Sequence, residues 1–104
     1  MAVWRPLERW RLRRSWRITE RYLEQAIAAL PADGVLECED GSLERCRDWL
    51  QHNEFGLAFE ELDALAKVND VPREFWVAML AAAEAMGFTE SAGEFRQTLS
   101  AYSG

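Results

Sequence analysis

Three side chains in this sequence are of types that can hold zinc or carry out nucleophilic catalysis. They are Cys38, Cys46 and His52, which is the only histidine. Structural zinc takes four ligands, usually with cysteines paired closely in sequence, whereas these three residues stand eight and six positions apart. Cys46 also falls on the apolar stripe of a predicted helix, where a thiol is unreactive. We therefore expect no metal, no cofactor and no catalytic residue, and we predict that the chain is not an enzyme.

The carboxylates after residue 40 form a second candidate, a binding surface. They occupy polar positions of two successive predicted helices, and an acidic connection with Glu37, Glu39 and Asp40 precedes them. A negative surface attracts and steers a basic partner, and it can occupy a cleft built for the phosphates of nucleic acid. The alternative interpretation is an ordinary solvated helix face. The candidate partner-binding residues are Glu44, Asp48, Glu54, Glu60, Glu61 and Asp63.

The N-terminal segment is a third candidate because it is rich in arginine and tryptophan. Residues 1–25 carry a net charge of +4, whereas the rest of the chain carries −10. Trp4, Trp10 and Trp16 recur every six residues among the arginines, and this combination can bind single-stranded nucleic acid. Two alternatives are packing of the indoles on a neighbouring helix and an extension that the folded body does not need. The acidic body disfavours nucleic acid as the partner.

The elements that must position these residues are predicted to be helices. From Ser15 onward apolar residues recur three to five positions apart, and Pro31 ends this first helix. A second helix is predicted over Leu43–Gln51. Ser42 is its expected N-cap, and His52 is placed to bond its last carbonyl groups.

Three more helices are predicted after residue 52. The third follows Asn53 as its cap, and the fourth starts near Pro72 and ends before Gly87, which suits a helix C-terminus. Thr89 is the expected cap of the fifth helix. The predicted apolar faces are Phe55, Ala58, Phe59, Leu62, Leu65 and Ala66 on the third helix, Trp76, Met79, Leu80, Ala83 and Met86 on the fourth, and Ala92, Phe95, Leu99 and Tyr102 on the fifth.

This pattern predicts an all-α protein, an antiparallel helical bundle of about five helices with short loops. A length of 104 residues suits one domain, and we assign residues 1–14 to an N-terminal arm and residues 15–104 to a single helical domain. The longest apolar run, residues 76–83, is far below the ~20 residues of a membrane-spanning helix. The N-terminus lacks the apolar stretch of a signal peptide. We expect a cytoplasmic protein with both thiols reduced.

Two motifs carry a family resemblance. They are the segment WLQHNEFGLAFEEL at residues 49–62 and the later turn Met86-Gly87-Phe88. Both resemble a recurring pattern in small helical bacterial immunity proteins of the Maf type, which accompany polymorphic toxins. The resemblance covers about residues 43–99 and leaves the arginine-rich arm unmatched. It implies a cognate toxin, often a nuclease, held inactive in a tight complex.

The leading hypothesis is therefore an immunity protein that binds and neutralises a cognate toxin, a basic nuclease domain, through the acidic helical surface. The first alternative is a helical adaptor that binds a peptide between the third and fourth helices. The second alternative is a nucleic-acid-binding protein that uses the arm. We expect no membrane partner, and the sequence leaves the oligomeric state open.

Overall fold

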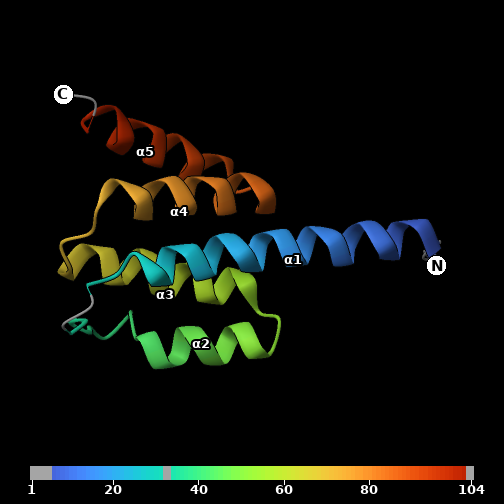
Figure 1. Ribbon diagram of the computed structural model, residues 1–104, viewed down its shortest axis with the longest axis horizontal. Coiled ribbons are helices and arrows are strands. Elements are labelled where there is room, and N and C mark those ends of the chain that lie inside the picture. Colours follow the sequence, from blue (N-terminus) through green and yellow to red (C-terminus); the bar gives the residue numbers. More distant parts are fainter. Residues whose placement is uncertain (1–5, 32–33, 103–104) are drawn as a thin grey trace.

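The protein is built from helices, as the sequence predicts. The computed structural model describes the backbone of residues 6–31 and 34–102, and side chains from residue 16 onward within these ranges. Within them the helices are α1 (Pro6–Ala28), α2 (Leu43–Gln51), α3 (Phe55–Val68), α4 (Arg73–Met86) and α5 (Thr89–Ser100). The prediction of an all-α bundle with five helices is confirmed over this part of the chain (Figure 1).

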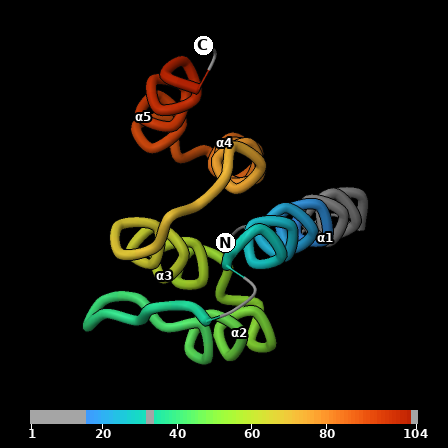
Figure 2. The backbone as a smooth tube through the Cα atoms, turned by 60° about the vertical axis from the view of Figure 1, so that its left-hand side comes forward, coloured from blue at the N-terminus to red at the C-terminus, as the bar shows by residue number. Residues whose placement is uncertain are grey.

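The helices form two pairs with α1 between them. The first pair, α2 with α3, and the second pair, α4 with α5, are each joined by a short turn. α1 packs against α4 and α3, so it lies between the pairs (Figures 1 and 2). One helix therefore supplies most of the contact between two halves that touch each other only lightly through α3 and α4.

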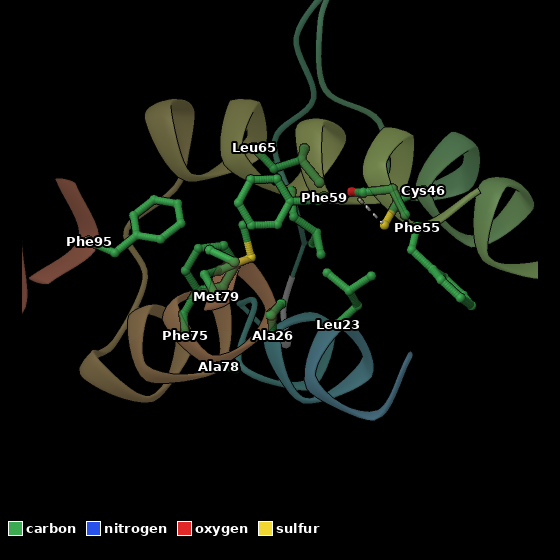
Figure 3. Close-up of a cluster of buried hydrophobic side chains, with 14 of the residues drawn as sticks. Leu23, Ala26, Cys46, Phe55, Phe59, Leu65, Phe75, Ala78, Met79 and Phe95 are labelled. Atoms are coloured by element: carbon green, nitrogen blue, oxygen red, sulfur yellow. Dashed lines mark hydrogen bonds between the residues drawn. The ribbon is translucent and has the colours of Figure 1, made fainter. Parts of the chain in front are cut away.

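The hydrophobic core lies where α1, α3 and α4 meet. Leu23 and Ala26 of α1 are fully buried there, and they face side chains from α3 and α4 (Figure 3). On α3 the predicted stripe is confirmed, because its large side chains, including Phe59, are buried and Ala66 is the one partly exposed member. This match follows from the helical period of 3.6 residues, which brings every third or fourth side chain to one face.

The predicted stripe of α4 is incomplete. Met79 and Ala83 are buried as expected, but Trp76 is only partly buried, and so are Leu80 and Met86. The fully buried side chains of α4 include Phe75, which the stripe omitted; Ala78 and Ala82, also omitted, are buried as well. The reason is that α4 packs on α1 with one face and on α5 with another, so it buries a wider sector than one stripe.

Two of the predicted helix ends are confirmed. Ser42 caps α2, since its hydroxyl accepts a hydrogen bond of 3.3 Å from the backbone N–H of Arg45. Gly87 ends α4 in the left-handed conformation with φ of 75°, and the next N–H, of Phe88, donates to the carbonyl of Ala83 at 2.8 Å. Such a paired end satisfies carbonyl groups that the helix leaves free.

Two other predicted caps are wrong by one residue. Asn53 adopts a left-handed φ of 58° in the α2–α3 turn, and the residue before α3 is Glu54, whose side chain makes no cap hydrogen bond. Thr89 is the first residue of α5, and Phe88 precedes it. Both turns are so short that each predicted cap falls one position from the true helix boundary.

The first helix includes residues that the sequence left unassigned. It begins at Pro6, and α1 runs unbroken through the proposed boundary between arm and domain. Proline suits this place because its fixed φ matches the helix and its missing N–H is not needed in the first turn. Residues 1–5 of the predicted arm lie outside the described residues.

The connection between α1 and α2 is held against α3 at two points. The side-chain amide of Asn69 accepts from the N–H of Leu36 at 2.9 Å and donates to its carbonyl at 2.7 Å. Further along, Gly41 pairs with Cys38 and is buried against α3. A Cβ at Gly41 would lie 2.9 Å from the backbone nitrogen of Leu65, so only glycine allows this close approach.

We predict opposite effects for alanine at two glycines. Gly41→Ala pushes a methyl group into the backbone of α3 and should lower the free energy of unfolding by ~1–3 kcal/mol. Gly93→Ala, inside α5, meets no atom within 4 Å and should raise it by ~0.5–1 kcal/mol. Urea unfolding of both variants checks this, and an unchanged midpoint for Gly41→Ala would contradict the close packing.

Candidate functional site

Glu61 does not lie on the acidic surface for which the sequence suggested it. Its side chain is only 9% exposed, and its carboxylate lies between α3 and α2. The guanidinium of Arg45 donates to it through Nε at 3.0 and 3.1 Å, and Nη2 of Arg45 lies 3.0 Å from Oε1. The backbone N–H of Ser42 donates to the same oxygen at 3.2 Å. The assignment of Glu61 to an exposed docking surface is therefore wrong. Its carboxylate is buried and accepts the hydrogen bonds that join α3 to the start of α2.

The burial of Glu61 had a signal in the sequence. Residue 61 stands three positions after Ala58 and four before Leu65, so it belongs to the buried stripe of α3. A carboxylate in such a stripe needs a cationic or N–H donor, because burying an unpaired charge is costly. Arg45 supplies it and also donates to the carbonyl of Glu39 at 2.9 Å. The hydrogen bond that Arg45 donates to Glu61 raises the pKa of Arg45.

Glu60 and Asp63 lie on a different side of α3 from Glu61. With Glu90 of α5 they line a hollow of about 470 Å³ between α3 and the α4–α5 turn. The remaining lining residues are Phe59, Gly87, Phe88, Thr89 and Ser91. The hollow thus combines three carboxylates with two aromatic rings, and none of its described lining residues is cationic.

Glu54 lines a second hollow that shares Phe88 with the first. This hollow measures about 400 Å³ and lies where α1, the start of α3 and the end of α4 meet. Its lining residues are Trp16, Asn53, Glu54, Phe55, Gly56, Ala85, Met86 and Phe88. Because Phe88 belongs to both hollows, they adjoin. We call the surface made by these two sets of lining residues the Phe88 face.

Phe88 is held in place by the core. Its ring meets that of Phe59 edge to face, with centroids 5.3 Å apart, and Phe59 in turn contacts Phe95 of α5. Its backbone is fixed by the hydrogen bond to Ala83 at the end of α4. The aromatic part of the Phe88 face is therefore preorganised rather than assembled on binding.

Glu44 and Asp48 lie elsewhere, on α2. They line a third hollow, of about 430 Å³, together with Arg45, Arg47 and Gln51. This hollow differs from the Phe88 face because two arginines line it beside the two carboxylates, although Arg45 is also paired with Glu61. The six predicted partner-binding residues therefore separate into three places: Glu61 inside, Glu44 and Asp48 on α2, and Glu54, Glu60 and Asp63 on the Phe88 face.

Glu90 is a member of the Phe88 face that the sequence did not suggest. It stands in the first turn of α5, where a carboxylate is ordinary because it favours the helix N-terminus. Its place beside Glu60 depends on how the α4–α5 turn packs on α3. No pattern in the sequence reports that packing.

The two cysteines and the histidine do not converge. The Cys46 thiol is buried and donates to the carbonyl of Ala58 at 3.5 Å, whereas the thiol of Cys38 approaches the carbonyl of Ala64 at 3.7 Å. His52 bonds the carbonyl of Asp48 at 2.8 Å, which confirms its predicted place at the end of α2. Among the side chains that the structure describes, no group of three or more histidines, cysteines or carboxylates is placed to hold a metal ion.

In its fold and candidate site, the protein is a small all-α domain that presents carboxylates around the aromatic ring of Phe88. Comparison of this chain with protein-family models, with curated proteins and with solved structures gave no match. Within residues 6–31 and 34–102, no helix has both the length and the apolar content needed to cross a bilayer.

We predict that the two thiols differ in reactivity. Burial raises the pKa of Cys46 to about 12, so at pH 8 only roughly one thiol in ten thousand is ionised. Iodoacetamide should therefore modify the partly exposed Cys38 in the native protein and reach Cys46 only after denaturation. Mass spectrometry of peptides after timed labelling measures both rates, and equal rates at pH 8 would contradict the buried position of Cys46.

We also predict that two adjacent glutamates differ in their effect on stability. Glu61→Gln weakens a charged acceptor that serves Arg45 and the N–H of Ser42, and should lower Tm by about 4–8 °C. Glu60→Gln changes an exposed carboxylate and should leave Tm within about 2 °C. Thermal unfolding followed by circular dichroism checks both variants. A larger shift for Glu60→Gln than for Glu61→Gln would reverse the assignment.

Proposed function

We propose that this protein binds a basic protein partner on the Phe88 face and that the partner is a toxin, which the complex neutralises. The observation that carries the proposal is the gathering of Glu54, Glu60, Asp63 and Glu90 around Phe88, with no cation among the lining side chains that the structure describes. Tight interfaces typically combine an aromatic contact at the centre with charged groups at the rim. The Phe88 face has both parts.

Charge supports a basic partner. The chain after residue 25 carries a net charge of −10, and the Phe88 face belongs almost entirely to that part. Such a field speeds the encounter with a positively charged protein. Because nuclease clefts are lined by cations that hold phosphates, carboxylates arranged on a firm surface can occupy such a cleft in place of nucleic acid.

The resemblance to small helical immunity proteins points the same way. It covers about residues 43–99, a range that contains all four carboxylates of the Phe88 face and Phe88 itself. The two arguments share Glu54 and Glu60, which lie in the motif segment at residues 49–62, whereas Asp63 and Glu90 enter through the charge argument alone.

The two alternative functions have less support. A peptide bound between α3 and α4 would need an open groove, but Leu23 and Ala26 of α1 fill the space on one side (Figure 3). On the other side, rings of Phe59 and Phe95 are in contact. A nucleic-acid-binding protein would have to hold phosphates close to a strongly acidic body, which repels them.

The test of the proposed function starts with genetics. We expect a reading frame beside the gene to encode a large secreted protein with a nuclease-like C-terminal domain. Production of that domain in a cell should stop growth, and co-production of this protein should restore it. Failure of the protein to protect against any flanking gene product would refute the toxin as partner.

We predict that charge reversal on the Phe88 face weakens the complex. Glu60→Lys with Asp63→Lys should slow association with the toxic domain by about tenfold or more at low ionic strength and reduce its salt dependence. The matched control is Glu44→Lys with Asp48→Lys on α2, which changes the net charge equally and should keep most of the wild-type rate. Stopped-flow or surface plasmon resonance measures the rates. Equal slowing by both pairs would show that only net charge matters and would remove the Phe88 face as the interface.

A further inference from the structure

We infer that the protein forms a two-fold dimer in which residues 1–17 of each copy dock on the Phe88 face of the other. This inference gives a role to the arginine- and tryptophan-rich segment that the proposed function leaves unused. It does not depend on the identity of any toxin. Because the docked segment covers the face on which the proposed function places the partner, the dimer must dissociate before the partner binds there.

The charges of the two surfaces are complementary. By sequence, residues 1–17 contain six arginines, one glutamate and three tryptophans, a net charge of +5. Among its described lining residues, from Trp16 onward, the Phe88 face offers four carboxylates, an aromatic floor and no cation. Arginine pairs well with carboxylates and also lies favourably on aromatic rings, so each chemical group of the segment has a counterpart on the face.

The segment leads away from its own body. α1 is a continuous helix, and its first buried side chain among those described is Thr19. Trp16 and Ile18 are 47% and 38% exposed, and Arg17 is exposed as well. Figure 1 shows the start of α1 extending past the ends of the other four helices. A continuous helix cannot turn back, so the helical residues before Trp16, residues 6–15, lead away from the Phe88 face of their own chain.

Trp16 sets the geometry of the dimer. It stands where α1 leaves the body, and it is also a lining residue of the Phe88 face. Two copies brought together with their α1 helices antiparallel therefore place each segment over the other's face at the same time. The helical residues 6–16 rise ~15 Å at 1.5 Å per residue, which is about three helical turns. The same contact is made twice, so the assembly closes as a dimer.

Nucleic acid is the competing ligand for the segment, and the charge distribution favours the dimer. A phosphate chain bound to residues 1–17 would pass the carboxylates of the Phe88 face beside Trp16 and be repelled by them. The same carboxylates attract the segment of a second copy. In the dimer the positive segment and the negative Phe88 face attract each other. In a nucleic-acid complex the segment attracts the phosphates while the Phe88 face repels them.

Sedimentation velocity of the full-length chain with charge-swapped variants tests the inference. Arg9 and Arg13 stand four residues apart in the sequence, which is the spacing of neighbours on a helix. The wild type should sediment as a dimer at low ionic strength and dissociate as salt is added. Arg9→Glu with Arg13→Glu, or Glu60→Arg with Asp63→Arg, should raise the dimer dissociation constant about tenfold or more. All four changes together should restore the dimer, because both partners have exchanged charge.

The control pair is Glu44→Arg with Asp48→Arg on α2, which should leave the dimer intact. Circular dichroism verifies that every variant is folded, and restoration by the fourfold variant shows that loss of the dimer was not unfolding.

A wild type that is monomeric at low salt overturns the inference, and so does a dimer that survives both the arginine pair and the carboxylate pair of reversals. If the monomer instead binds a single-stranded oligonucleotide and Arg9→Glu with Arg13→Glu abolishes that binding, the segment is a nucleic-acid arm. The protection experiment measures the complex with the toxic domain, whereas sedimentation measures the dimer of this protein. Either proposal can therefore fail while the other holds.

Discussion

The carboxylate of Glu61 inside the α2–α3 pair is the contact on which the orientation of α3 depends. It is held by Arg45 and by the backbone N–H of Ser42, and Arg45 also holds the preceding connection through Glu39. A helix turns by ~100° per residue, so fixing residue 61 toward α2 places residue 60 about 100° and residue 63 about 160° away from that direction. The burial of one carboxylate thereby exposes two others where the α4–α5 turn meets α3.

The Phe88 face is continuous with the hydrophobic core, which makes it firm. Phe59 is buried in the core and forms part of the floor of the face, and its ring supports that of Phe88. The left-handed Gly87 ends α4 so that Phe88 can reach back over α3. α1 completes the arrangement, because it joins the two helix pairs and places Trp16 at the edge of the same face. The core packing of Phe59, the turn at Gly87 and the position of Trp16 thus all shape the Phe88 face.

The sequence predicts the features that depend on local periodicity and turn chemistry, and it misses those that depend on which elements meet. The stripe of α3 and the ends marked by Ser42 and Gly87 follow from helical spacing and hydrogen-bonding rules. Phe75 was missed because α4 packs against two helices. Glu90 was missed because its neighbours come from a different helix. Glu61 was assigned to the surface by its charge, although its spacing places it on the buried stripe.

Labelling of carboxyl groups in the folded protein tests the central claim most directly, which is that Glu61 points inward while Glu60 and Glu90 point outward. Carbodiimide coupling of an amine in the native state, followed by mass spectrometry of peptides, gives a rate for each carboxylate. The structure predicts rapid modification of Glu60 and Glu90, slower modification of the partly buried Asp63, and protection of Glu61 until the protein unfolds. Modification of Glu61 at the rate of Glu60 in the native protein would contradict the account.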